Sequence, residues 1–521
     1  MKNALFIPIL VLTCVTITAC STDSEPDLPA YTLTIEITPE GAGTTNPLPG
    51  GFDEGANLEL EAIPAENYLF DRWEGDLTTE SNPADLTMNS DKVITAVFKR
   101  EPLTMGGDGS QANPYQVHTL DDLVAIGLEE NLDKHYIQVA DIDASESEKL
   151  NNGSGFTHIG DAEHPFTGVY DGDGFVIRDL HLNFNRSDSH NGLFGYAKNA
   201  EIVNVIVDNS TQLNMKFKGF FDDAAQATKH SASPKVAEWE FSHAEERGIA
   251  GLVGTNDGGL VSHCYFKGRV KGDISQAVAG LVGINSGTIE HSSFEGEVSS
   301  GGGGVGLVFF NHGLISDSSV KARITGQVAF GFVGFNVGDI LNSYADIDVA
   351  GSNGGATGFV GRHESGTISS SFVRGRTFSG NSVAGFVNSN NAEIHDVYSA
   401  TDLVMVDFND NRTIAGFVVT NEENGNIENS YFTGSVEITG SSGFTKAAMI
   451  ENLGTLGSLY WDMERSDLND AVLDGSPDGA TGLSTAEMRG PAAEKNMPGF
   501  DWVNIWRTTE GGYPKLRWEE E

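Results

Sequence analysis

The hexapeptide from Gly280 to Asn285, Gly-Leu-Val-Gly-Ile-Asn, is the strongest indication of the fold of this chain because variants of it return at a nearly fixed interval. The strong copies are GLVGTN from Gly251, GLVFFN from Gly306, GFVGFN from Gly331, GFVGRH from Gly358, GFVNSN from Gly385 and GFVVTN from Gly416, and the weaker copies are GLFGYA from Gly192 and GFTKAA from Gly443. From Gly251 onward the leading glycines lie 25 to 31 residues apart. A period of this size is typical of stacked repeat architectures.

One repeat contains short runs of valine, isoleucine and aromatic residues that alternate with glycine and polar turns. In the repeat that begins at Gly280 these runs are Leu281–Asn285, Gly287–Phe294 and Glu297–Ser299. Each run has the length of a strand, and none is long enough to predict a helix. The sequence therefore predicts an all-β protein whose main part is a parallel β-helix (solenoid) of about nine or more coils with end caps.

Two columns of equivalent residues support this interpretation. The fifth residue after each leading glycine is nearly always asparagine, in the column Asn256, Asn285, Asn311, Asn336, His363, Asn390 and Asn421. We expect these amides to hydrogen-bond from coil to coil as a structural ladder, with glycan binding as the weaker alternative. A second column holds small residues, namely Cys264, Ser292, Ser318, Ser343, Ser371, Val397 and Ser430. We expect Cys264 to be a buried small side chain and not a nucleophile.

The repeated phrase resembles the GLUG-motif proteins, which are named for it. The resemblance covers most of residues 106–521 and includes an opening segment at Gly106–Ser110 and a first coil at Phe166–Gly174. It implies a β-helix of bacterial surface or secreted proteins, and it implies no single activity.

The first 20 residues combine Lys2, an apolar run from Ala4 to Val15, and Ile17-Thr18-Ala19-Cys20. This pattern resembles a bacterial lipoprotein signal, which implies that Cys20 becomes the acylated first residue of the mature protein. The acyl chains imply a membrane anchor, and Ser21 resembles the sorting pattern of outer-membrane lipoproteins. The alternative is an ordinary signal peptide that happens to precede a cysteine.

After a linker at residues 21–30, residues 31–99 alternate apolar and polar side chains and predict a separate small β domain. This segment is similar to the divergent internalin B-repeat modules that serve as spacers in bacterial surface proteins. Trp73 lies beside Phe70 in the pattern, so we expect it to pack in the core and not to bind carbohydrate.

The solenoid is expected to begin with a cap and first coils at residues 106–190, followed by the repeats at 191–450. Thr119 and Asp122 form a capping-box pattern, which predicts a short helix that covers the open N-terminal end. The closing segment at 451–521 is expected to plug the last coil with its aromatic residues. Its acidic stretch from Asp467 to Asp478 is interpreted as a solvated loop, because calcium binding is supported by no specific motif.

The interval from Gly192 to Gly251 is 59 residues, so it contains an insertion at residues 211–247. Insertions in a rigid scaffold often contain the residues that bind a ligand. Basic and aromatic residues gather in it, and the candidate ligand-binding set is Lys216, Phe217, Lys218, Phe220, Phe221 and Trp239. An equally weighted alternative is a flap whose aromatic residues pack on the flank of the solenoid.

Charge and motifs limit the function. The chain has 74 acidic and 31 basic residues and a formal net charge of −43, so nucleic acid is a poor partner. The only His-Glu pair, His363-Glu364, lacks the second histidine of a zinc peptidase motif. Asp257, Asp317, Asp339 and Glu364 could form an acidic ridge on the outer turns, which is the one feature that favours a polysaccharide lyase or hydrolase.

The sequence thus predicts a lipoprotein of the cell envelope, in the outer membrane and exposed at the surface. Its solenoid would act like an adhesin and bind a glycan or a protein of a host or neighbouring cell, without a catalytic or metal site or a cofactor. The alternatives are a β-helix polysaccharide lyase or hydrolase, and a structural spacer or matrix protein.

Overall fold

The computed structural model describes residues 30–65, 68–100, 105–182, 189–209, 247–272, 277–406, 412–439 and 443–520. The chain divides into two compact units, residues 1–104 and 105–521. Cys20 lies outside the described residues, and so do all six candidate residues of the insertion: Lys216, Phe217, Lys218, Phe220, Phe221 and Trp239.

The first unit is a small β domain of two sheets. One sheet has the order β3-β1-β7-β5, with strands β3 (Gly50–Asp53), β1 (Ala30–Thr38), β7 (Lys92–Arg100) and β5 (Tyr68–Gly75). The other has the order β2-β4-β6, with strands β2 (Gly43–Asn46), β4 (Asn57–Pro64) and β6 (Ala84–Thr87). Trp73 is fully buried and its ring centroid lies 5.5 Å from that of Phe70, so its expected place in the core is confirmed.

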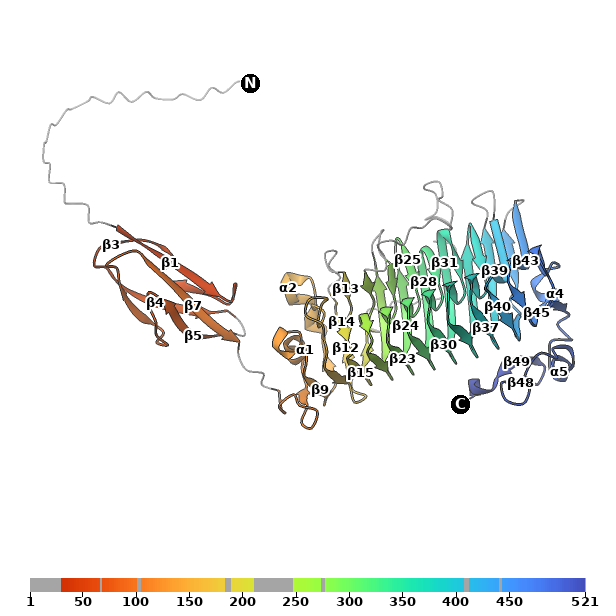
Figure 1. Cartoon of the computed structure of the whole chain (residues 1–521), viewed down its shortest axis with the longest axis horizontal. Helices are drawn as coiled ribbons and strands as arrows, with labels where there is room; N and C mark the ends of the chain where they lie inside the picture. Colours follow the sequence, from red (N-terminus) through yellow and green to blue (C-terminus); the bar gives the residue numbers. More distant parts are fainter. Residues whose placement is uncertain are drawn as a thin grey trace, which may run out of the picture. The chain divides into compact units, whose positions relative to one another are not determined.

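The second unit is a parallel β-solenoid, in which strands of successive coils lie side by side (Figure 1). The strands that carry the repeated phrase are β14 (Phe194–Lys198), β18 (Val253–Asp257), β22 (Val282–Asn285), β26 (Val308–Asn311), β29 (Val333–Asn336), β32 (Val360–His363), β36 (Val387–Asn390), β39 (Arg412–Asn421) and β43 (Phe444–Asn452). The next strand of each coil belongs to a 12-stranded sheet made of β8 (Tyr115–Val117), β9 (His135–Gln138), β11 (Val169–Asp171), β15 (Glu201–Val203), β19 (Leu260–Ser262), β23 (Thr288–Glu290), β27 (Leu314–Ser316), β30 (Asp339–Leu341), β33 (Thr367–Ser369), β37 (Glu393–His395), β40 (Asn426–Glu428) and β44 (Thr455–Leu456).

The third strand of each coil contributes to an outer face of the solenoid. These strands are β12 (Val176–Arg178), β16 (Ile206–Asp208), β20 (Tyr265–Lys271), β24 (Ser293–Ser299), β28 (Ser319–Phe330), β31 (Tyr344–Thr357), β34 (Phe372–Ser379), β38 (Tyr398–Val406), β41 (Ser430–Phe432) and β45 (Leu459–Asp462). Shorter strands such as β21 (Ala277–Ala279), β25 (Gly303–Val305) and β35 (Ser382–Ala384) complete the coils. The predicted fold, a parallel solenoid preceded by a small β domain, is confirmed.

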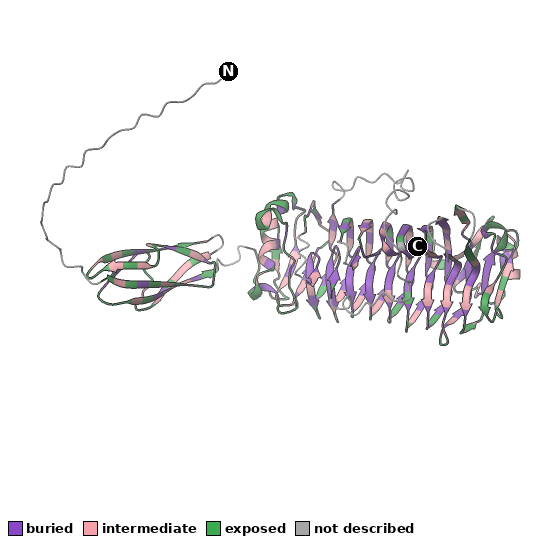
Figure 2. Ribbon diagram, turned by 90° about the horizontal axis from the view of Figure 1, so that it is seen from above, coloured by how far each residue is buried: buried purple, intermediate pink, exposed green. Residues whose placement is uncertain are grey.

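The interior of the solenoid repeats the same side chains at the same positions, and buried residues recur from coil to coil (Figure 2). Ile289 pairs with Ile315, which pairs with Ile340. The second residue of the phrase forms a stack of phenylalanine rings, with centroids 4.6 to 5.1 Å apart, at Phe332, Phe359, Phe386 and Phe417. The constant period therefore exists because each coil must match the packing of its neighbours.

One repeat assignment is wrong. Asn421 pairs with Asn452 and Val418 with Met449, so the last copy of the phrase begins at Ala447 and not at Gly443. Alanine replaces both the leading glycine and the phenylalanine in this copy. The Gly-Leu or Gly-Phe pair that marks the start of the other copies is therefore absent.

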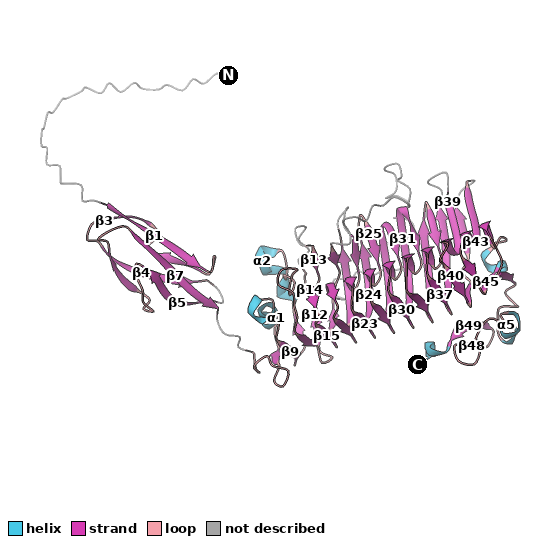
Figure 3. Ribbon diagram, viewed as in Figure 1, coloured by secondary structure: helices cyan, strands magenta, loops and turns pink. Residues whose placement is uncertain are grey.

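The N-terminal end is covered as predicted. Helix α1 (Leu120–Ile126) is capped at its N-terminus by Thr119. The Thr119 hydroxyl accepts from the Asp122 backbone amide, and the Asp122 carboxylate accepts from the Thr119 backbone amide. Leu123 and Ile126 are fully buried beneath it. A second helix, α2 (Leu150–Gly153), lies at the same end of the solenoid (Figure 3).

The C-terminal end differs from the expectation. Leu468, which follows helix α4 (Met463–Ser466), is fully buried, and its backbone oxygen accepts a 2.9 Å hydrogen bond from the Trp461 indole. A Cβ atom on Gly416 would come within 2.8 Å of Leu468, so this leucine fills the last coil from within. The acidic stretch is not a loop throughout, because it contains β46 (Val472–Gly475), which pairs with β43.

The rest of the closing segment contains α5 (Pro491–Asn496), β48 (Trp506–Thr509), β49 (Gly512–Leu516) and the 3-10 helix Arg517–Glu520. It runs back along the flank of the solenoid, where the Trp518 indole donates to the backbone oxygen of Ser370. The expectation that its aromatic residues plug the last coil is therefore wrong for Trp506 and Trp518. The interior of the last coil is already filled, so Trp506 and Trp518 pack against an apolar column on the outer surface instead.

Candidate functional site

The outer face of the third strands carries two columns of alternating charge. The strand registers align one column as Lys267, Glu295, Lys321, Asp346 and Arg374, and the other as Arg269, Glu297, Arg323, Asp348, Arg376 and Asp402. We call this surface the charged face. In a chain with 74 acidic and 31 basic residues, it gathers six of the basic side chains in these two columns.

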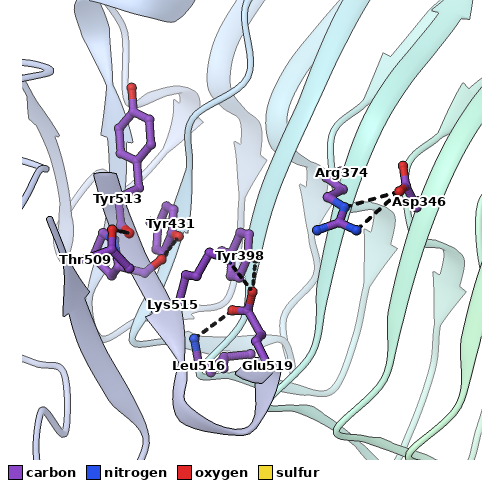
Figure 4. Close-up of polar contacts among 10 residues, drawn as sticks. Asp346, Arg374, Tyr398, Tyr431, Thr509, Tyr513, Lys515, Leu516 and Glu519 are labelled. Atoms are coloured by element: carbon purple, nitrogen blue, oxygen red, sulfur yellow. Dashed lines mark hydrogen bonds and ion pairs between the residues drawn. The ribbon is translucent and has the colours of Figure 1, made fainter. Parts of the chain in front are cut away.

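Ion pairs join some of the neighbouring members of the two columns. The Lys267 Nζ to Glu295 Oε1 distance is 3.6 Å, the Arg269 guanidinium lies 3.0 Å from Glu297, and that of Arg374 lies 3.3 Å from Asp346 (Figure 4). All of these side chains are partly exposed, so each pair contributes little to stability by itself. The alternation matters more for register, because a coil in the wrong position would bring like charges together.

Asp348 lies between Arg323 and Arg376 in the register of the column. Partial burial raises the pKa of this carboxyl, and the two guanidinium groups oppose that shift. Asp348 follows an arginine of one coil and precedes an arginine of the next, so it continues the alternation of charge along the column.

Beside the charges runs a column of aromatic residues, Tyr344, Phe372, Tyr398, Tyr431 and Tyr460, aligned by strand pairing. The rings from Tyr344 to Tyr431 stack with centroids 4.9 to 5.1 Å apart and nearly parallel planes. Such a column could bind sugar rings if it were open. Here the closing segment covers it, with Trp518 against Phe372 at 5.6 Å and Trp506 against Tyr431 at 5.6 Å.

Polar contacts hold the closing segment on the aromatic column (Figure 4). The Tyr398 hydroxyl donates a 3.0 Å hydrogen bond to the Glu519 carboxylate, and the Tyr431 hydroxyl donates to the backbone oxygen of Pro514. Burial raises the pKa of Glu519, while hydrogen bonds from Leu516 and Tyr398 lower it. The covered column is thus part of the fold, and the open part of the face lies toward the N-terminal coils.

A hollow of about 230 Å³ opens at that N-terminal edge. It is lined by Leu180, His181, Leu182, Asn209, Phe266, Arg269 and Lys271. The hollow exists because β20 is longer than its neighbour: β16 pairs only with Tyr265–Lys267, which leaves the rest of β20 without a strand on that side among the described residues. We call this place the step hollow.

The asparagines form the ladder that their spacing suggests. Side-chain amides donate at 2.8 Å from Asn256 to Asn285 and from Asn285 to Asn311, at 2.7 Å from Asn311 to Asn336, and at 2.8 Å from Asn390 to Asn421. All six are buried, so they are not available to a ligand. The ladder also includes Asn452, which accepts from Asn421 at 2.8 Å and which the misplaced last repeat left out of the predicted column.

His363 occupies one position in this ladder. Its Nδ1 receives a 3.0 Å hydrogen bond from Asn336 Nδ2, and its Nε2 lies 3.1 Å from the backbone oxygen of Glu393. The ring is therefore the neutral tautomer with its proton on Nε2. Burial lowers the pKa of His363 to about 4.

The other candidates do not come together. Asp317 lies at a left-handed turn with φ of 48°, Asp339 begins β30, and Asp257 and Glu364 follow the ladder position in coils that are not adjacent. The proposed acidic ridge is therefore wrong. Cys264 is buried, and desolvation raises the pKa of its thiol to about 12, so it is a poor nucleophile.

A column of left-handed turn residues was also missed. It consists of His263, His291, Asp317, Asn342, Ser370, Asp396 and Asn429, all with φ between 45° and 54°. The repeated aspartate and asparagine were a signal for this conformation. Over the described ranges, no group of three or more His, Cys, Asp or Glu residues is arranged to hold a metal ion. No helix in the same ranges is long and apolar enough to span a membrane.

Comparison with known proteins identifies the first unit. Residues 33–102 match the family model described as the divergent InlB B-repeat domain, which confirms the resemblance of the small β domain. A stretch of 194 residues is 30% identical to halomucin of Haloquadratum walsbyi. This stretch is 35% of the present chain and 2% of halomucin, so the chain spans only a small part of that relative.

Among solved structures, the chain is similar to a protein of Bacteroides ovatus that is provisionally described as an immunoglobulin A1 protease. The match covers 79% of this chain and 95% of that protein, with 16% identity and a TM-score of 0.31. These comparisons identify one domain of the chain, the divergent InlB B-repeat domain at residues 33–102.

Proposed function

We propose that this protein is a lipid-anchored protein of the bacterial cell surface that uses the solenoid to bind a glycan or a protein of another cell. The observation that supports this most is the charged face, an outer surface on which acidic and basic side chains alternate from coil to coil in two columns. A surface whose side chains are fixed in position loses little entropy on binding.

The order of the parts agrees with this proposal. A lipoprotein-like signal ending at Cys20 precedes a B-repeat domain, and the solenoid with its GLUG-like phrase follows. In this arrangement the acyl chains hold the protein in the outer membrane and the B-repeat domain is the spacer between anchor and solenoid. Many charges on the solenoid keep it soluble at the cell surface.

Protease shaving of intact cells tests the localisation. We expect trypsin to release peptides from the solenoid without lysis, while a periplasmic marker protein stays intact. A Cys20→Ala variant tests the anchor, because it should no longer partition into detergent. Release of solenoid peptides only after lysis would place the protein in the periplasm and contradict the proposal.

A glycan and protein-ligand screen tests the binding. The full chain, solubilised in detergent, is applied to immobilised glycans and to intact cells of other strains. We expect saturable binding that is lost on unfolding. A surface-exposed protein that binds none of these would instead be the structural spacer.

A further inference from the structure

The step hollow has a preformed shape because Asn209 holds its two sides together. The Asn209 backbone amide donates to the backbone oxygen of Lys267 at 2.8 Å, which ties it to β20. Its side chain bonds both backbone groups of Leu180, accepting from the nitrogen at 2.8 Å and donating to the oxygen at 2.9 Å. Asn209 is itself buried, with 4% of its surface exposed, so the walls of the hollow are fixed by interior hydrogen bonds.

The lining divides into an apolar floor and a basic rim. Leu180 and Phe266 are buried, and with Leu182 they supply the apolar surface. The rim carries His181, Arg269 and Lys271, which are exposed, and the seven lining residues include no carboxylate. This composition is unusual in a chain with a net charge of −43.

The two cations of the rim can both reach a ligand. Arg269 is oriented by Glu297, which its Nε and Nη2 contact at 3.0 Å, and a guanidinium has further N–H donors to offer. Among the described residues Lys271 makes no ion pair, and its position in β20, two residues after Arg269, places both side chains on the same outer face.

We propose that the step hollow binds the terminal acidic sugar of a glycan, with the carboxylate at Arg269 and Lys271 and the apolar side of the ring over Leu180, Leu182 and Phe266. This inference rests on the proposed function and names its ligand class. The hollow, at about 230 Å³, is smaller than the roughly 300–1,000 Å³ of sites for drug-sized ligands. It therefore fits one sugar residue at a chain end and not the middle of a polysaccharide.

Titration of the detergent-solubilised full chain tests the inference, with saturation-transfer NMR as the readout. The probes are glucuronic acid, N-acetylneuraminic acid, glucose, acetate, and an oligosaccharide that ends in glucuronic acid. We expect both sugar acids and the oligosaccharide to bind, and glucose and acetate to bind at least roughly tenfold more weakly, a difference of about 1.4 kcal/mol. Equal binding of glucose and glucuronic acid would overturn the proposal, as would equal binding of acetate.

Three variants locate the site. Lys271→Glu should weaken binding of glucuronic acid by at least about tenfold, whereas Lys271→Arg should keep it within about twofold. Lys321→Glu is the matched control, because Lys321 is an exposed lysine of the charged face that does not line the hollow. If Lys321→Glu weakens binding as much as Lys271→Glu, general electrostatics explains the effect and the site is wrong. Circular dichroism melts check that all variants are folded.

The outcome is separable from that of the proposed function. If the protein binds other glycans and Lys271→Glu does not affect that binding, the step hollow is not the binding site, and the proposed role at the cell surface still stands. If solenoid peptides are released only after lysis, the proposed role at the cell surface is wrong. Binding of sugar acids at the step hollow would then be a function in the periplasm.

Discussion

The indole nitrogen of Trp506 donates a 3.0 Å hydrogen bond to Asp396 Oδ1, across 110 positions of the sequence. Asp396 is buried and lies at a left-handed turn with φ of 54°. Its Oδ2 also lies 2.9 Å from His395 Nδ1, and the hydrogen bond that the imidazole donates to this carboxylate raises the pKa of His395. One carboxylate thus connects the closing segment to the turn before β38.

Substitutions at Asp396 should separate the contribution of the hydrogen bond with Trp506 from that of the left-handed backbone conformation. Asp396→Asn keeps an acceptor for Trp506 and tolerates the left-handed turn, whereas Asp396→Gly keeps the turn and removes the acceptor. We expect the glycine variant to be less stable than the asparagine variant by about 1–3 kcal/mol, because the buried indole N–H loses its partner. Urea unfolding measures this difference. In a Trp506→Phe background the difference should shrink, and an unchanged difference would show that the bond is not its cause.

The asparagine ladder predicts a large cost for losing one rung. Asn311 is fully buried, accepts from Asn285 and donates to Asn336. Asn311→Ala leaves a donor and an acceptor unpaired in the interior, so we expect a loss of about 2–5 kcal/mol in the free energy of unfolding. Asn424→Ala, at an exposed turn, is the control and should change stability by less than about 0.5 kcal/mol. Equal effects in thermal melts would contradict a structural role for the ladder.

His363 predicts acid sensitivity. Its pKa is lowered to about 4, so below the ordinary histidine value of about 6.5 the unfolded chain binds a proton that the folded chain does not. The free energy of unfolding should therefore fall by about 3 kcal/mol as the pH drops from about 6.5 to about 4, and be unaffected by this group above that range. His363→Asn should remove this loss while matching the wild type at pH 7. His312→Asn, at an exposed position, should leave the pH profile unchanged. The test is the urea midpoint at each pH, and coincident curves for wild type and His363→Asn would refute it.

The charge columns predict that deleting two adjacent coils preserves the alternation of charge, whereas deleting one coil brings like charges together. Deleting residues 306–330 removes Lys321 and Arg323 and places Glu295 and Glu297 beside Asp346 and Asp348. Deleting residues 280–330 instead places Lys267 and Arg269 beside the same aspartates, which restores alternation. Opposed like charges cost roughly 0.2–1 kcal/mol a pair and are screened by salt. We expect the thermal midpoint of the one-coil deletion to rise with sodium chloride and that of the two-coil deletion to stay level or fall. The same salt response in both would argue against the columns as a register device.

The acidic end of the solenoid predicts protection against association. β46 and β47 (Ala480–Leu483) are the last strands of the large solenoid sheet. The exposed residues Asp470, Asp474 and Asp478 lie on or beside them, next to exposed Leu473. Open strand edges pair with other chains unless charge prevents it. Replacing the three aspartates by asparagine should therefore produce oligomers in analytical ultracentrifugation. Glu36→Gln, Glu59→Gln and Asp85→Asn together make the same change in net charge on exposed strands of the small domain. If that control associates equally, net charge and not the edge is responsible.

The sequence predicted those features that repeat with the coil. The asparagine and small-residue columns could be aligned because each coil has to match its neighbours, and the cap at Thr119 depends only on local chemistry. The position of the closing segment could not be predicted in this way, because Trp518 belongs to no repeat and its hydrogen bond to Ser370 spans 148 positions of the sequence. A signal existed nonetheless: the outer aromatic column from Tyr344 to Tyr460 is too apolar to remain uncovered. The alternating charges of the charged face are also present in the sequence, on the second strand after the repeated phrase.

The length of the closing segment has a consequence for how this gene can change. The segment reaches back along the aromatic column as far as Tyr344, where the Trp518 and Tyr344 ring centroids are 6.4 Å apart. Duplication or loss of a coil between Tyr344 and Tyr460 would put the contacts on the N-terminal side of the change out of step, whereas a change between Tyr265 and Ser319 would leave all of them in place. Natural variants of this protein should therefore differ in coil number on the N-terminal side of Tyr344 and share a fixed number beyond it.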